Sequence, residues 1–114
     1  MIALALPFPP SVNHYWRNVN GRVLISKQGR AYRKEVGEMC MVAKVKTLTR
    51  GVGVKVRAYP PDRRRRDLDN LLKALLDALQ HGGMYEDDSQ IDEIQITRGI
   101  VVPGGAVDVE VYAI

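Results

Sequence analysis

Prolines and glycines divide this chain of 114 residues into short segments, which restricts it to a small domain of mixed elements. Residues 7–10, Pro-Phe-Pro-Pro, end an apolar segment over residues 1–6, because proline lacks the N–H group that a strand ladder needs. Pro60 and Pro61 end a second segment, over 51–59, in which valines alternate with glycine and basic residues. Such alternation is typical of a half-buried strand. Both segments are therefore predicted to be strands.

Two other segments carry the apolar period of a helix. From Leu68 onward, leucines recur on one helical face, and Gly82-Gly83 closes this pattern at its C-terminal end. An earlier helix is predicted from Ser26, as its N-cap, to about Lys46, because apolar side chains recur there at near-helical spacing. These side chains are Tyr32, Val36, Met39, Ala43 and Val45.

The remaining segments predict a hairpin and two more strands. Asn20-Gly21 favours a type I′ turn, which predicts a hairpin over residues 17–25. Isoleucines over 91–96 and valines over 107–111 predict two strands, joined by a turn at residues 103–105. The order of elements predicts an α/β (α+β) fold in which a mixed sheet packs against two helices. The length suits a single domain over the whole chain, residues 1–114.

Several classes of protein are excluded by the composition. No apolar run approaches the roughly 18 residues of a membrane-spanning helix, so no membrane partner is expected. The apolar opening lacks a basic leader and stops at Pro7, which predicts a strand rather than a signal peptide. Cys40 is the single cysteine, so neither a disulfide within the chain nor a Cys/His zinc site is expected. A cytoplasmic location without a small-molecule cofactor is the simplest expectation.

Charge is distributed unevenly along the chain, whose formal net charge is +4. Residues 1–57 contain 11 Lys and Arg against 2 Asp and Glu, whereas residues 58–114 contain 6 against 11. The basic half predicts an anionic partner such as nucleic acid. The acidic half suits such a partner only if its carboxylates hold a cation.

A run of arginines leads directly into the acidic residues at the start of the leucine-rich helix. Four adjacent arginines suit a polyanion, because each neutralised phosphate releases counterions, although a solvated surface loop is the alternative. Asp67 and Asp69 can both lie near the helix start, either as caps that favour the helix dipole or as ligands. The arginines are Arg63, Arg64, Arg65 and Arg66.

Lys73 and a second acidic group extend this pattern. Lys73 follows Asp69 by four residues on the same helix face, where it forms an exposed ion pair or directs its charge to a phosphate or an attacking water. A loop carries Glu86, Asp87 and Asp88, and it either returns a carboxylate to the first group or is simply solvated. Carboxylates repel a phosphate 4 Å away by about 4 kcal/mol at an effective dielectric of 20, and bound Mg²⁺ reverses that sign. Basic and acidic groups together predict metal-dependent phosphodiester hydrolysis.

These motifs closely resemble the RusA family of Holliday junction resolvases, and the resemblance spans nearly the whole chain. Its most specific part is the Asp-Leu-Asp-Asn-Leu core over residues 67–71, with an Asp-Asp pair downstream. The matching segments are residues 7–13 with Tyr15, residues 31–33, residues 63–73, residues 77–79 and residues 87–91.

The resemblance implies a homodimeric, Mg²⁺-dependent endodeoxyribonuclease, with Mn²⁺ as a substitute ion. Such an enzyme binds branched, four-way DNA junctions and resolves them by paired symmetric nicks in DNA recombination and repair; the family is often encoded by prophages. By position, Asp67, Asp69 and Asp88 correspond to the metal-binding carboxylates, and Lys73 corresponds to the essential lysine. Asp87 is the less certain member of the adjacent pair. A non-catalytic branched-DNA-binding module and a less selective flap nuclease are the alternatives.

Further DNA contacts are predicted around the first long helix. Asn13 and Tyr15 lie in an aromatic-rich loop that suits stacking on distorted bases at a branch point, although packing against the core is the alternative. Basic residues of the helix are candidates for phosphate contacts, with an ordinary solvated face as the alternative. These residues are Lys27, Arg30 and Arg33. Two-fold symmetry of a dimer would supply two sites for two cuts.

Overall fold

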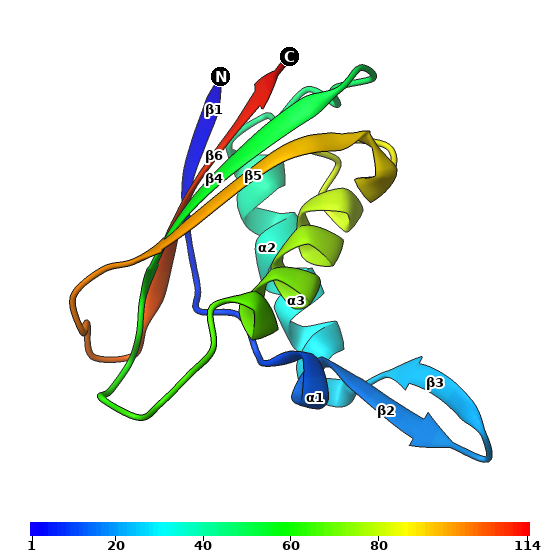
Figure 1. The fold of residues 1–114 in the computed structure, drawn as a ribbon. Coiled ribbons are helices and arrows are strands. Elements are labelled where there is room, and N and C mark those ends of the chain that lie inside the picture. Colours follow the sequence, from blue (N-terminus) through cyan, green and yellow to red (C-terminus); the bar gives the residue numbers. More distant parts are fainter.

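The computed structural model describes residues 1–114 and places a four-stranded mixed sheet against two long helices (Figure 1). The strand order is β1-β6-β4-β5. The strands are β1 (Ile2–Leu6), β4 (Val52–Tyr59), β5 (Ile91–Arg98) and β6 (Ala106–Ala113), and the long helices are α2 (Lys27–Val42) and α3 (Asp69–His81). The predicted fold class, a mixed sheet packed with helices, is confirmed.

Three short elements complete the chain. A one-turn helix and a separate two-stranded hairpin lie between β1 and α2, and a 3-10 turn precedes β5. They are α1 (Val12–Tyr15), β2 (Trp16–Val19), β3 (Arg22–Ile25) and η1 (Asp88–Gln90). The hairpin was predicted from Asn20-Gly21, and these residues adopt φ angles of 51° and 78°, which the turn requires.

The sheet is mixed because α3 connects two of its strands. β4 pairs antiparallel with β6 but parallel with β5, and a parallel pair needs a long crossover such as the one that contains α3. Both helices cover the same face of the sheet (Figure 1). The start of α3 is thereby held next to the loop that leaves β4, which is the arginine-rich loop.

One apolar core joins the sheet to the helices. The alternation predicted for β4 is present, since Val52, Val54 and Val56 are buried while Lys55 and Arg57 are exposed. The leucine face of α3 and one face of α2 pack onto these valines. The buried residues of α3 are Leu71, Ala74, Leu75, Ala78 and Leu79, and those of α2 are Gly29, Tyr32, Val36 and Cys40.

Two local expectations were wrong. α2 ends at Val42 rather than near Lys46, because Lys44 adopts a positive φ of 54° that turns the chain out of the helix. Residues 12–15 form a one-turn helix where a loop was expected, since four residues are too few to show a helical period. None of the helices combines the length and the apolar character that crossing a bilayer requires.

Candidate functional site

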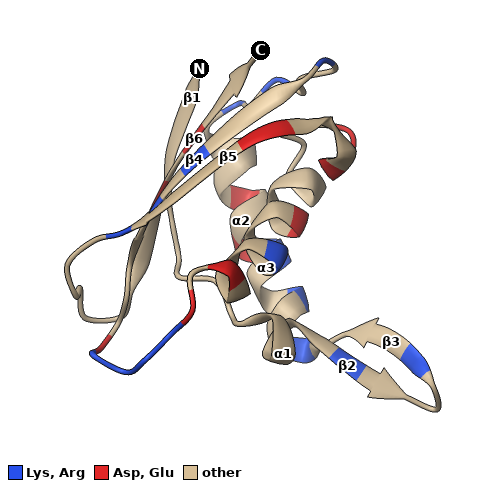
Figure 2. Ribbon diagram, viewed as in Figure 1, with Lys and Arg blue, Asp and Glu red and all other residues tan.

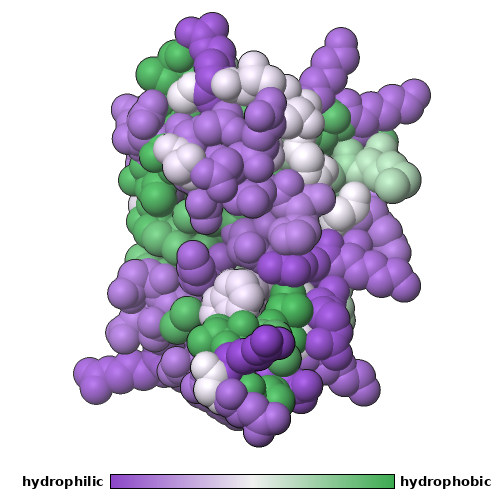
Figure 3. Space-filling view, turned by 90° about the vertical axis from the view of Figure 1, so that its right-hand side faces the viewer, coloured by the Kyte–Doolittle hydropathy of each residue, from purple (hydrophilic) through white to green (hydrophobic).

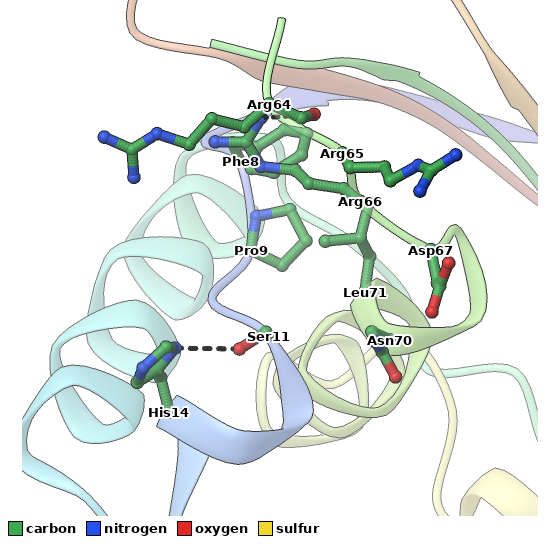
Figure 4. A pocket seen from close by; sticks show the side chains of 10 residues that line it. All are labelled: Phe8, Pro9, Ser11, His14, Arg64, Arg65, Arg66, Asp67, Asn70 and Leu71. Carbon is green, nitrogen blue, oxygen red and sulfur yellow. Dashed lines mark hydrogen bonds between the residues drawn. The ribbon is translucent and has the colours of Figure 1, made fainter. Parts of the chain in front are cut away.

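The arginine-rich loop and α1 enclose a cavity of about 490 Å³ (Figure 4). One wall comes from the segment between β1 and α1, and the other comes from the loop after β4 together with the first turn of α3. Its lining is largely polar and cationic. The lining residues are Phe8, Pro9, Ser11, His14, Arg64, Arg65, Arg66, Asp67, Asn70 and Leu71.

Arg66 anchors the loop from within. Its Nη1 donates to Oδ1 of Asp62 at 2.7 Å, and its guanidinium lies 5.8 Å from the centre of the Phe8 ring. The Arg66 hydrogen bond, followed by the backbone N–H of Arg64, lowers the pKa of Asp62 to about 2. Arg98 also donates to the carbonyl oxygen of Arg66 at 2.9 Å. Of the four arginines, Arg66 therefore holds the loop in place.

The other three arginines are left for a partner. Arg63 and Arg65 form no ion pair within the chain, and Arg64 reaches Asp62 only at 3.8 Å with its side chain 84% exposed. Figure 4 shows Arg64 and Arg65 pointing to opposite sides of the cavity, with Arg65 on the side of Asp67. These three exposed guanidinium groups suit phosphate oxygens.

Asp67 and Asp69 lie at the start of α3 with free carboxylates. The N-cap of this helix is Leu68, which has helical φ and ψ angles, and no side chain caps the helix. Asp67 takes part in the start of the helix only through its backbone carbonyl oxygen, which accepts a hydrogen bond from the N–H of Asn70 at 3.2 Å. Neither carboxylate forms an ion pair. These residues were expected either to cap the helix or to bind a ligand. Their side chains do not cap it, so both carboxylates are available to a ligand.

Lys73 is exposed on α3, one turn beyond Asp69, and the two do not form the ion pair that their spacing allows. Its ammonium group is free as well. Figure 2 shows this distribution as a basic loop before α3 and acidic residues at both ends of the helix. The charges around the start of α3 are thus largely unneutralised by the protein itself.

Asp87 and Asp88 have different roles in the fold. Asp87 is the N-cap of η1, and its carboxylate accepts hydrogen bonds from the hydroxyl and the N–H of Ser89, which lower its pKa. Asp88 has no ion-pair partner, and its backbone N–H donates to Oε1 of Gln80 at 2.9 Å. The capping role leaves Asp88 as the available carboxylate of the pair.

The length of α3 separates Asp88 from the first acidic pair. Asp69 begins this helix, whereas Asp88 is bonded to Gln80 near its end. Because a helix rises 1.5 Å per residue, Gln80 lies about 16 Å along α3 from Asp69. No three Asp, Glu, His or Cys side chains within the chain are grouped closely enough to hold a metal ion. Asp67 and Asp69 nevertheless fit Mg²⁺ in their chemistry, because this ion takes one or two carboxylates and fills its other positions with water and phosphate. The three-carboxylate site stays a prediction.

Tyr15, Arg33 and Asp77 form a cluster that sequence reasoning missed. The buried hydroxyl of Tyr15 donates to the Asp77 carboxylate and accepts from Nε of Arg33 at 2.9 Å, while Nη2 of Arg33 lies 2.7 Å from Asp77. Burial, followed by the bond to Asp77, raises the pKa of Tyr15. Asp77 lies 44 positions after Arg33 and 62 positions after Tyr15, and no sequence signal links residues so far apart. A DNA contact by the buried Tyr15 would require these bonds to break, whereas Nη1 of the half-buried Arg33 has no partner within the chain.

The remaining predicted contacts lie on the surface. Asn13, Lys27 and Arg30 are exposed, and Nη1 of Arg30 donates to the carbonyl oxygen of Ile25 at 3.0 Å. His14 belongs to the aromatic-rich loop predicted to contact DNA, although it was not singled out there as a site residue. Its Nδ1 lies 2.8 Å from Oγ of Ser11, and its ring lines the cavity opposite the arginines.

A cationic cavity beside free carboxylates, on a small α+β fold, defines a class of protein whose site suits a phosphodiester polyanion and a divalent cation. Comparison with known families narrows this class. The family described as Endodeoxyribonuclease RusA matches residues 7–112, and the chain belongs to this family.

Curated relatives support the same assignment over nearly their full lengths. Crossover junction endodeoxyribonuclease rusA of Enterobacteria phage HK97 is 47% identical over 107 residues, which cover 93% of this chain and 89% of that protein. Crossover junction endodeoxyribonuclease RusA of Escherichia coli K12 is 38% identical over 110 residues, 96% and 92% of the two chains. The protein of the same name from Enterobacteria phage 82 is 38% identical over 109 residues. The family predicted from the sequence is confirmed, and the phage relatives fit the predicted prophage context.

Proposed function

We propose that this protein is a Holliday junction resolvase, an endodeoxyribonuclease that binds four-way DNA and hydrolyses one phosphodiester bond in each of two strands. The observation that carries this proposal is the cavity lined by Arg64, Arg65 and the unpaired Asp67, which precedes the first residue of α3, Asp69, by two positions. Family membership and the names of the relatives support the junction as substrate. A DNA substrate fits action in the cytoplasm, and the proposal needs no small-molecule cofactor.

The arginine loop is proposed to hold the DNA backbone. Arg63, Arg64 and Arg65 present exposed guanidinium groups, of which only that of Arg64 reaches Asp62, while Arg66 keeps the loop in shape through Asp62. Asn13, Lys27 and Arg30, which are exposed, are proposed as further DNA contacts. Each phosphate contact releases counterions, so the affinity is expected to fall steeply with salt.

Asp67 and Asp69 would hold Mg²⁺, or Mn²⁺ in its place, at the start of α3. When bound, the ion supplies charge stabilisation for the phosphate and lowers the pKa of a water molecule. Lys73, with its free ammonium group one turn further along the helix, would balance charge on a phosphate oxygen. Asp88 is proposed as the third carboxylate.

A homodimer would supply both the second cut and the missing carboxylate. A junction needs two incisions, and two-fold symmetry presents two sites to a two-fold symmetric substrate. Within one subunit, Asp88 is bonded to Gln80, which lies about 16 Å along α3 from Asp69. Two α3 helices arranged antiparallel about a two-fold axis would bring the end of one beside the start of the other. Asp88 of the partner subunit would then lie beside Asp67 and Asp69.

The test is cleavage of an end-labelled four-way junction with and without Mg²⁺. We expect paired symmetric nicks from the wild-type protein in Mg²⁺, and binding without nicking from Asp69→Asn. Glu86→Gln is the matched control, because it removes a charge from an exposed acidic residue that is not a proposed ligand. Nicking by Asp69→Asn at the wild-type rate would refute the metal assignment.

The same assay separates the two alternative functions. Tight binding without any product in Mg²⁺ or Mn²⁺ would identify a non-catalytic branched-DNA-binding module. Equal cutting of four-way, three-way, flap and linear substrates would identify a less selective nuclease.

A further inference from the structure

The hairpin β2–β3 projects from the body of the molecule without packing on the sheet (Figure 1). Its two strands pair only with each other. An isolated two-stranded hairpin is marginally stable in water at best, so such an arm is expected to gain order from a partner. The hairpin follows α1 directly, and α1 contributes to the wall of the arginine cavity.

The register of the hairpin gathers its two arginines on one face. Arg17 pairs with Leu24, and Arg22 pairs with Val19, which places these four side chains on the same side of the ribbon. The opposite side begins with Trp16 and Ile25, which pack against the core. The face that carries Arg17 and Arg22 is therefore turned away from the core.

This face is charged and unpartnered. Neither Arg17 nor Arg22 forms an ion pair within the chain, and both are exposed. Residues 1–34 contain no Asp or Glu, so the arm and the start of α2 carry only positive charge. Figure 3, seen from the side on which the arm projects, shows apolar surface bordered by strongly hydrophilic side chains near its lower end. Within the arm, Val23 and Leu24 are 65% and 41% exposed.

The base of the arm is held firmly. Trp16 packs edge-to-face on Tyr15 with ring centres 5.0 Å apart, and Ser26 donates from Oγ to the carbonyl oxygen of His14 at 2.5 Å. Gly29 lets α2 approach α1 closely, because a Cβ at this position would lie 2.6 Å from the carbonyl oxygen of Tyr15. The arm therefore leaves the body in a defined direction.

We propose that the hairpin is a DNA-gripping arm that lays the Arg17 and Arg22 face along a duplex arm of the junction. This proposal rests on the proposed junction substrate. Two strands about 5 Å apart form a ribbon that the major groove, about 12 Å wide, admits. Four extended residues reach about 13 Å, so the arm contacts DNA beyond the phosphates held at the cavity. Because this face of the arm is positively charged and the DNA backbone is negatively charged, the proposed partner of the arm is duplex DNA.

The test compares two double variants that remove equal charge. Arg17→Gln/Arg22→Gln alters the arm, whereas Lys44→Gln/Lys46→Gln removes two exposed charges beyond the far end of the 16-residue helix α2. Binding of a fluorescent four-way junction is measured at several salt concentrations. We expect the arm variant to bind about 10-fold to 100-fold more weakly, with a salt slope smaller by about 2, and the control to change far less. Both variants are expected to melt as the wild type does, because the arm arginines have no partner within the chain.

Three outcomes would refute a proposal: the first concerns the proposed function, and the other two concern the DNA-gripping arm. Wild-type protein that cuts no junction refutes the proposed function itself. Wild-type protein that cuts normally, while the arm variant and the control bind alike, refutes the arm. A change in sedimentation caused by the arm variant alone would show that the hairpin serves a second copy of the chain, which also refutes DNA as its occupant.

Discussion

Two charged regions of this molecule lie on neighbouring elements and differ in whether the protein neutralises them. Between the helices, Arg33 binds Asp77 and the hydroxyl of Tyr15 at 2.7–2.9 Å, and that hydroxyl also donates to Asp77. At the start of α3, Asp67 and Asp69 have no partner within the chain. Charges that a fold pairs internally serve its stability, whereas charges that it leaves unpaired at an exposed cavity are available to a ligand. Loss of a paired charge should therefore affect unfolding first, and loss of a free charge should affect activity first.

The largest expected effect is a loss of cleavage activity on substitution of an unpaired carboxylate at the start of α3. Asp67→Asn should reduce junction cleavage by about 100-fold or more, because a cation at the start of α3 loses one of its two adjacent carboxylates. Its melting temperature should stay at the wild-type value, since the carboxylate has no partner in the fold. Single-turnover cleavage and thermal unfolding of the same preparation would check both statements, and a large loss of stability would contradict the assignment.

Substitution within the paired cluster of Tyr15, Arg33 and Asp77 is expected to reduce stability. Asp77→Ala leaves the Arg33 guanidinium and the Tyr15 hydroxyl without their partner among three packed helices, and we expect a loss of about 2 kcal/mol in the free energy of unfolding. Partial exposure of the pair, at 23% and 16% of the two side chains, keeps this figure below that of a fully buried pair. Urea denaturation measures it. Glu38→Ala, an exposed acid on α2, is the control and should change stability little.

A smaller effect is expected for Arg65, an arginine of the loop that forms no ion pair within the chain. Arg65→Ala should weaken junction binding by about 3-fold to 10-fold and lower the salt slope by about 1, because one phosphate contact is lost. The melting temperature should not change, since Arg65 forms no ion pair in the chain. Salt titrations of binding measure the slope, and an unchanged slope would remove Arg65 from the phosphate contacts.

The smallest effect concerns the ion pair within the arginine loop. The pKa of Asp62 is lowered from 3.8 to about 2 by Arg66 and the Arg64 N–H, so its ionised form is favoured in the folded state. A lowered pKa contributes stability that is present above pH 3.8 and is lost as the pH falls through about 2. The melting temperature of the wild type should slightly exceed that of Asp62→Asn at neutral pH. That difference should vanish between about pH 4 and pH 2, and a constant difference would contradict the assignment.

Local patterns predicted most of the fold. Alternating valines in β4, the leucine face of α3 and Asn20-Gly21 in the hairpin each depend on neighbours a few residues away, and the structure bears them out. The family likewise followed from a contiguous motif around Asp67 and Asp69. The end of α2 was wrong by about four residues, because the turn at Lys44 breaks the helix while the apolar spacing continues to Val45.

The candidate site was less predictable wherever it depends on distant residues. The family resemblance favoured Asp88 over Asp87, but no local pattern showed the physical reason, which is the capping box that engages the Asp87 carboxylate at η1. Nor could the sequence show that Arg66 is used inside the loop while Arg65 is free, because the four arginines are identical in type and adjacent. Arg33 was expected to contact DNA, but its partner Asp77 is 44 positions away.

The sequence by itself determined the segment order, the α+β class and the family, because periodicity, turn residues and a short acidic motif are all local properties. Tertiary structure alone decided which charges are free. It paired Arg33 with Asp77 and Arg66 with Asp62, and it left Asp67, Asp69 and Asp88 without an ion-pair partner. It also set Asp88 at the far end of α3 and turned the Arg17 and Arg22 face of the hairpin outward. Pairing and exposure depend on which residues packing brings together, and side chains 44 or 62 positions apart meet only after the helices pack on the sheet.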